Sequence, residues 1–168
     1  MRTIGLNLGS NLGDRREMLS FAVERIGTLL GCRLRVSHIY ESEPWGYQSD
    51  NPFYNIAAEF ESDIALERLL DLLQQVEREA GSLSHRTADG SYADRSLDID
   101  IIYAGSEVVA TERLTVPHPR MDRRLFVLKP LQQLSPRWRH PVSGLTVDEM
   151  VAALESEADS ERKGAVDC

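Results

Sequence analysis

Residues 95–102, "RSLDIDII", alternate aspartate with isoleucine, and the rest of the predicted topology is built around this pattern. Side chains of a β-strand return to the same face every second residue, so the alternation predicts a strand. Ile99 and Ile101 then share one face. Asp98 and Asp100 share the other, with Cα atoms roughly 6.6 Å apart.

The two aspartates have two explanations from the sequence, and both stay open at this point. They can form the solvated face of a half-buried edge strand. They can also form a metal site, because Mg²⁺ binds one or two carboxylates and keeps water and substrate phosphates as its other ligands. Two neighbours favour the metal site: apolar Ile102 is on the aspartate face, and Arg95 precedes the strand, where it could meet an anion.

The segments before this strand predict alternating strands and helices from their periodicity and their Gly or Asp boundaries. In chain order they are a strand at 3–8, a helix from about Asp14 to Gly31, a strand at 33–42, a strand at 53–62 and a helix at 64–81 that ends at Gly81. The resulting βαββαβ order predicts an α+β, ferredoxin-like sandwich, with helices packed on a mainly antiparallel sheet. We expect the first strand and the aspartate strand to be neighbours at the centre of that sheet.

The chain after the aspartate strand predicts smaller elements. A short extended segment leads to a turn bracketed by Pro117 and Pro119, and a final helix is interrupted or ended by Pro130. From about residue 155 the sequence is charged and poor in aliphatic residues, which predicts fraying. We therefore expect one domain over 1–155 and a frayed tail over 156–168.

Length and charge exclude several classes of protein. The 168 residues carry a net charge of −8, which argues against general nucleic-acid binding. No apolar run is long enough for a membrane span and no signal peptide is visible, so we expect a cytoplasmic protein. One window, 113–129, holds five basic residues and one acid. It is either a solvated loop or a cradle for an anion.

Other residues suggest what that anion belongs to. Trp45 and Phe53 flank a loop, where they could stack on a flat ring whose edge Asn55 could bind. His118, set between two prolines among arginines, favours a phosphate contact. No Walker motif and no nucleophile with its base is visible. Carboxylates for Mg²⁺, arginines for phosphates and aromatics for a ring fit phosphoryl-type transfer, which needs no protein nucleophile.

Taken together, these motifs resemble the 6-hydroxymethyl-7,8-dihydropterin pyrophosphokinase family. The match runs in order from residue 4 to about 136. Its segments are "GLNLGSNLGD" (5–14), "YESEPWGYQSDNPFYNIA" (40–57), "QQVE" (74–77), "YADRSLDIDIIYAG" (92–105) and "ERLTVPHPRMDRRLFVLKPL" (112–131).

The resemblance implies that the terminal diphosphate of ATP is transferred to the hydroxymethyl group of the pterin, releasing AMP, in folate biosynthesis. It implies two Mg²⁺ ions bound by Asp98 and Asp100, and small-molecule substrates. We also expect a monomer. It implies pterin contacts at Ser42, Trp45, Phe53, Asn55 and Phe126. It implies ATP contacts at Gln74, Glu77, Tyr92, Arg95, Ile101, Arg113, Thr115, His118 and Arg124.

The chain departs from the family in the segment after the second helix. Ser82 and Ser84 stand where the family usually has arginine. We expect Arg86, in the same loop, to take that catalytic role beside Arg95 and the two aspartates. The departure leaves two alternatives open: another Mg²⁺-dependent nucleotide enzyme such as a phosphohydrolase, or a module that binds pterin or nucleotide without reacting.

Overall fold

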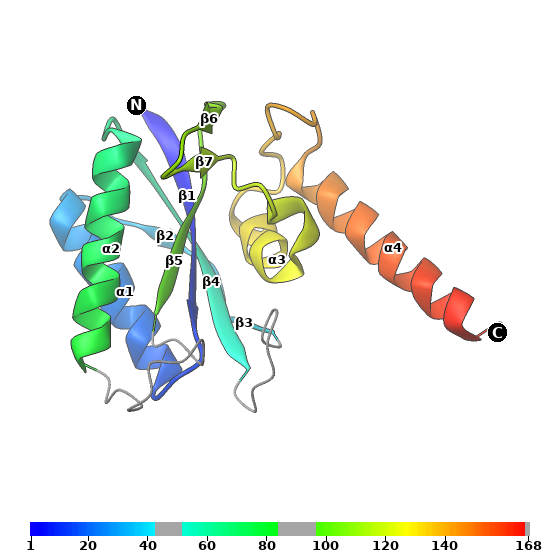
Figure 1. Cartoon of the computed structure of the whole chain (residues 1–168), viewed down its shortest axis with the longest axis horizontal. Coiled ribbons are helices and arrows are strands. Elements are labelled where there is room, and N and C mark those ends of the chain that lie inside the picture. The colour runs from blue at the N-terminus through cyan, green and yellow to red at the C-terminus, as the bar shows by residue number, and fades with distance from the viewer. Residues whose placement is uncertain (43–51, 84–96, 167–168) are drawn as a thin grey trace.

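The structure, a computed structural model, describes residues 1–42, 52–83 and 97–166. A five-stranded antiparallel sheet lies between helices on both of its faces (Figure 1). The elements are β1 (Arg2–Ser10), α1 (Arg15–Leu30), β2 (Arg35–Val36), β3 (Tyr40–Ser42), β4 (Phe53–Ser62), α2 (Leu66–Leu83), β5 (Asp98–Ala104), β6 (Val109–Ala110), β7 (Thr115–Val116), the 3₁₀ turn η1 (Met121–Arg123), α3 (Leu125–Leu134) and α4 (Val147–Val166).

The sheet confirms the ferredoxin-like fold but corrects the place of the aspartate strand. The order is β2-β4-β1-β5, with β3 also paired to β4, so β1 is central and β5 is at an edge. Two groups bond to the outer edge of β5 where a further strand would otherwise pair. The Glu77 carboxylate accepts from the Ile99 N–H at 2.9 Å, and the His118 N–H donates to the Ile102 carbonyl at 2.8 Å. The predicted metal ligands Asp98 and Asp100 therefore stand on a strand whose outer edge pairs with no other described strand.

The strand predicted at 33–42 is instead two short strands, β2 and β3, separated at Ser37. The Ser37 hydroxyl accepts from the Ala57 N–H at 2.9 Å, while its own N–H donates to the Ala57 carbonyl. A side chain thus makes a bond that a strand backbone would normally make, and the regular ladder stops there.

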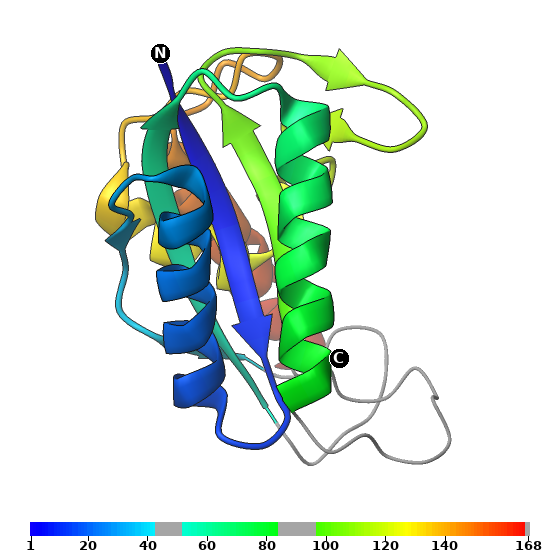
Figure 2. The ribbon, with the colours of Figure 1, turned by 90° about the vertical axis from the view of Figure 1, so that its left-hand side faces the viewer.

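Helices α1 and α2 cover one face of the sheet side by side (Figure 2). The Asp14 carboxylate caps α1 by accepting from the Glu17 N–H, and Gly31 ends it in the left-handed conformation, at φ +66°. Both ends confirm the prediction, whereas α2 continues past Gly81 to Leu83. A Cβ added at Gly81 would meet nothing within 4 Å, so no close contact forces the helix to end at this residue. The core on this face is mainly aliphatic, and its residues from β1, β4 and β5 are Ile4, Leu6, Leu8, Ile56, Ala58, Phe60, Ile99, Ile101 and Ala104.

Helix α3 covers the other face, and the beginning of α4 packs against α3 (Figure 1). The register between β1 and β5 shifts at Gly5, so Ile102 and Tyr103 both join the core on this side. Where the sequence predicted fraying after 155, α4 continues as helix to Val166. Its alanines and glutamates have high helix propensity, which accounts for the difference. In the chain as described, no helix is long and apolar enough to cross a membrane.

Candidate active site

The floor of the site is the end of β1, on the face that α3 covers. Gly9 pairs with Asp98 of β5 on one side and with Asn55 of β4 on the other. Two residues earlier, Asn7 pairs with Asp100 and Ala57. Adjacent strands lie about 4.8 Å apart, so the predicted metal ligands and the predicted ring-binding amide are separated by the width of two strands, roughly 10 Å.

The ring-binding side of the site is organised by Asn55, which is 2% exposed. Its Nδ2 donates to the Ser42 hydroxyl at 2.8 Å and to the Tyr40 carbonyl at 3.3 Å. These bonds occupy the amide donors and leave Oδ1 directed toward Gly9, where an added Cβ would lie 3.0 Å away. The same Cβ would lie 3.4 Å from the Phe53 ring, so Phe53 and Asn55 come together at the bare backbone of Gly9, and Ser42 is bonded to Asn55 behind them.

The acidic side of the site contains three carboxylates. Glu77 reaches from α2 to the edge of β5, beside Asp98 and Asp100. Burial, and after it the two aspartates, raise the pKa of Glu77 to about 7, against the opposing effect of the Ile99 N–H. Such a raised pKa is typical of a carboxyl group that is partly buried beside other carboxylates.

Mg²⁺ fits this donor set. Carboxylate oxygens are its preferred protein ligands, and one or two of them suffice when phosphates and water complete the shell. Within residues 1–42, 52–83 and 97–166, no group of three His, Cys, Asp or Glu side chains could hold a metal by itself. A cation held by Asp98 and Asp100 would keep its other positions for water and substrate phosphates.

A basic wall formed by the segment before α3 faces the acidic edge. The His118 Nδ1 accepts from the Arg120 N–H at 3.2 Å. Burial, and then the charges of Arg124 and Arg120, lower the pKa of His118 to about 4. At neutral pH the imidazole is uncharged and carries its proton on Nε2, as a hydrogen-bond donor. The Arg124 guanidinium lies 5.5 Å from the Phe126 ring centroid and is attracted by both aspartates.

Other predicted residues are spread along the outer edge of β5 and beyond it. The Ile101 side chain is 4% exposed in the core under α1 and α2, so only its backbone is available to a ligand. Strand alternation turns that backbone to the same edge as Ile99, the edge that Glu77 reaches. Gln74 is exposed one turn before Glu77, and Thr115 is exposed on β7.

Arg113 forms its ion pairs with α2, away from the basic wall. Its guanidinium pairs with Glu67 at 3.0 Å and with Asp71 at 2.6 Å, both on α2. Four predicted residues, Trp45, Arg86, Tyr92 and Arg95, lie outside the described part of the chain.

One residue of the site was missed from the sequence. Asn7 is 5% exposed, and its Nδ2 donates to the Phe126 carbonyl at 3.1 Å. The available signal was a polar residue two positions before Gly9, on the face of β1 opposite Ile4, Leu6 and Leu8. A buried amide in a central strand needs a hydrogen-bond partner, and that requirement could have marked it.

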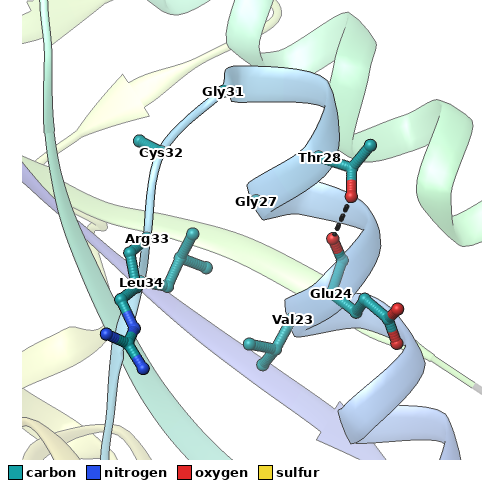
Figure 3. A pocket seen from close by; sticks show the side chains of 8 residues that line it. All are labelled: Val23, Glu24, Gly27, Thr28, Gly31, Cys32, Arg33 and Leu34. Carbon is teal, nitrogen blue, oxygen red and sulfur yellow. Dashed lines mark hydrogen bonds between the residues drawn. The ribbon is translucent and has the colours of Figure 1, made fainter.

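A hollow of about 550 Å³ lies elsewhere, around the C-terminal end of α1 (Figure 3). Val23, Gly27 and Leu34 form part of its lining, and the Thr28 hydroxyl donates to the Glu24 carbonyl at 2.9 Å. None of the predicted site residues lines it. The chemistry-bearing residues gather instead at the end of β1.

Comparison with known proteins shows which family and which relatives this chain is similar to. Residues 5–136 match the model of the family described as 7,8-dihydro-6-hydroxymethylpterin-pyrophosphokinase (HPPK). A Porphyromonas gingivalis protein is 41% identical over 142 residues, covering 84% of this chain and 95% of that protein. A Pseudomonas aeruginosa protein is 38% identical over 159 residues, covering 94% of this chain and 95% of that protein. Both are named 2-amino-4-hydroxy-6-hydroxymethyldihydropteridine pyrophosphokinase.

Solved structures agree on the fold. An HPPK-DHPS structure described as being in complex with substrates superposes with a TM-score of 0.71 at 11% identity. A Plasmodium falciparum HPPK-DHPS structure superposes with a TM-score of 0.71 at 12% identity, covering 95% of this chain. This chain spans 46% and 45% of the length of those two chains, so the likeness concerns less than half of each.

Proposed function

Because this chain belongs to the 7,8-dihydro-6-hydroxymethylpterin-pyrophosphokinase family, we propose that the site at the end of β1 is where its two substrates react. The family enzymes are diphosphotransferases of folate biosynthesis, and ATP is the co-substrate. The hydroxymethyl oxygen of the dihydropterin attacks the β-phosphorus of ATP. The bond from that phosphorus to the α,β-bridging oxygen breaks, AMP leaves, and the hydroxyl proton is lost.

One observation carries the assignment of the two halves: Gly9 has Asp98 on one side and Asn55 on the other. We assign the pterin to the Asn55 side, where the amide would bind the ring edge. Phe53 and Phe126 would stack on the ring, a geometry that aromatic pairs favour. Ser42, which Asn55 already bonds, and Trp45 complete the assigned pterin contacts.

We assign the triphosphate to the space between the acidic edge and the basic wall. Asp98 and Asp100 would hold two Mg²⁺ ions, which when bound neutralise phosphate charge. His118 would donate from Nε2, and Arg124 would supply positive charge from the other side. The remaining assigned ATP contacts are Gln74, Glu77, Tyr92, Arg95, Ile101, Arg113 and Thr115.

The catalytic arginines and the wider setting are also proposals. Arg95 would contact the phosphates, and Arg86 would serve in place of the arginine that the family usually has at position 82. If turnover of Arg86→Ala equals that of the unmodified protein, this role is wrong. We further propose a monomeric, cytoplasmic enzyme whose catalytic domain ends at about residue 155.

Product analysis tests the reaction. The protein is mixed with ATP, Mg²⁺ and 6-hydroxymethyl-7,8-dihydropterin, beside a reaction without pterin and one with Asp98→Ala. We expect AMP and pterin diphosphate in equal amounts, only with pterin, and neither from the variant. ADP, or AMP formed without pterin, would identify a different nucleotide enzyme. Pterin binding without any product would identify a binding module and direct attention to Ser82.

A further inference from the structure

We propose that Asn7 is a positioning residue that sets the place of Phe126 and, through it, the affinity for the pterin. This inference rests on the proposed function, since it takes Phe126 as a ring contact. Its basis is a hydrogen bond from β1, a central strand of the sheet, to the first turn of α3.

Helix α3 contains a proline at a position where a donor is needed. In an α-helix the N–H of residue 130 would donate to the carbonyl of residue 126. Pro130 has no N–H, so it cannot make that bond. The Asn7 Nδ2 donates to the Phe126 carbonyl instead, at 3.1 Å. A side chain from β1 therefore supplies the donor that the helix itself lacks.

The first turn of α3 depends on this bond more than an ordinary helix start would. Arg124, at the N-cap position, makes no side-chain capping hydrogen bond. Phe126 is half-buried and comes second in the helix, whereas the following residues Val127 and Leu128 are anchored in the core. The Asn7 bond thus ties the backbone that carries the Phe126 ring to the central strand of the sheet.

Asn7 is itself held firmly. It is 5% exposed, and its backbone lies between Ala57 of β4 and Asp100 of β5. The same residue therefore adjoins the strand of the proposed metal ligands through its backbone and the proposed stacking ring through its side chain. Through these two contacts, Asn7 sets the distance between the proposed metal ligands and the proposed stacking ring.

The test uses the fact that Pro130 has no N–H to donate to the Phe126 carbonyl. Asn7→Ala is expected to raise the KM for the pterin about five- to tenfold, the usual effect of losing one buried hydrogen bond, while the KM for ATP stays unchanged. Pro130→Ala alone is expected to behave like the unmodified protein. In Asn7→Ala/Pro130→Ala, the new N–H of residue 130 can reach the Phe126 carbonyl, so the pterin KM is expected to return.

A matched control separates positioning from general damage to α3. Gln132, on the same helix, donates to Asp148 of α4 at 2.9 Å. Gln132→Ala removes an α3 contact without touching Phe126, and its pterin KM is expected to stay unchanged. Thermal unfolding of every variant shows how much of any change comes from lost stability.

Three outcomes overturn the inference. They are an unchanged pterin KM in Asn7→Ala, a raised KM that the double variant does not restore, and an equal rise in the ATP KM. If Asn7→Ala alone does not fold, the double variant is compared with Pro130→Ala, where a higher pterin KM in the double variant overturns it. An unmodified protein that neither binds nor converts pterin defeats the proposed function itself, which is a separate result.

Discussion

The two ends of the sheet face that α3 covers hold their acidic side chains in opposite ways. At the end near β2, Glu59 has 0% exposure, and its carboxylate accepts from the Tyr103 hydroxyl, from Ser135 Oγ at 2.8 Å and from Arg35 at 2.9 Å. At the end near Gly9, burial and then the charges of Asp98 and Asp100 raise the pKa of their neighbour Glu77.

Glu59 therefore stabilises the fold, whereas the carboxylates near Gly9 are placed to bind a ligand. Donors from β2, β5 and the end of α3 all bond to the Glu59 carboxylate, so this cluster joins those three elements to β4. At the other end, the pKa of Glu77 stays raised, first because the group is buried and then because Asp98 and Asp100 lie beside it. A cation bound there would reduce the repulsion between these carboxylates.

Replacing one carboxylate at each end gives the largest contrast. Asp98→Asn is expected to lower kcat about 100- to 1,000-fold, because charge stabilisation by a bound metal is worth several kcal/mol. Its melting temperature is expected to stay level or rise, since like charges are removed. Steady-state rates and thermal unfolding measure both effects.

Glu59→Gln is the matched variant at the closed end. It is expected to lower stability and keep kcat per folded molecule, because it disturbs a cluster that makes no proposed substrate contact. The assignment of roles would be reversed if Glu59→Gln lost activity at full stability while Asp98→Asn stayed active.

Two glycines of β1 sharpen the contrast within one strand. A Cβ on Gly5 would come within 2.6 Å of Tyr103 Cδ1, in a ring that stacks on Trp138 at 4.4 Å. Overpacking of this kind costs about 1–3 kcal/mol, so Gly5→Ala is expected to lower the free energy of unfolding by that amount without changing the pterin KM. Denaturant unfolding measures it. Gly81→Ala, with nothing within 4 Å, is the control and is expected to stabilise α2 slightly.

Gly9→Ala is expected to act on the substrate rather than on the fold. The added Cβ would lie 3.0 Å from Asn55 Oδ1, a side chain already tied to Ser42 and Tyr40. The amide must shift by a few tenths of an ångström, beside a Phe53 ring that the new Cβ would contact at 3.4 Å. The pterin KM is therefore expected to rise several-fold while the ATP KM stays unchanged. Isothermal titration with each substrate checks this. Equal loss for both substrates would mean that Gly9 supports the whole site.

How far the sequence predicts this molecule depends on whether the information is local. Alternation of aspartate and isoleucine, the Asp14 cap and Gly31 depend on near neighbours, and those elements appear as predicted. The edge position of β5 depends on which strands pair, which no local pattern encodes. Continuation of α2 past Gly81 and of α4 past 155 shows that single breakers and charged stretches are weak signals against helix propensity.

The candidate site divides in the same way. Asp98, Asp100, Asn55 and His118 stand in motifs whose chemistry is visible in the residues themselves. Asn7 escaped prediction because its role needs two distant facts, a proline in α3 and the pairing of β1 with β5.

The smallest predicted effect concerns the proton on Glu77. The folded pKa of about 7 exceeds the ordinary 4.5, so between those values the folded protein holds a proton that the unfolded chain has lost. Its contribution to stability is therefore full below pH 4.5 and disappears as the pH rises through 7. Glu77→Gln keeps an acceptor for the Ile99 N–H but cannot titrate.

Stability measured from pH 5 to 7.5 in a metal chelator is expected to fall more steeply for the unmodified protein than for Glu77→Gln. Glu79→Gln is the control, because Arg25 holds the pKa of Glu79 at about 2, well below that range. Equal slopes for the unmodified protein and Glu77→Gln would mean that folding does not raise the pKa of Glu77. Added Mg²⁺ is expected to reduce the difference, because a cation favours the ionised form of Glu77 and relieves the repulsion that distinguishes this end of the sheet from the closed one.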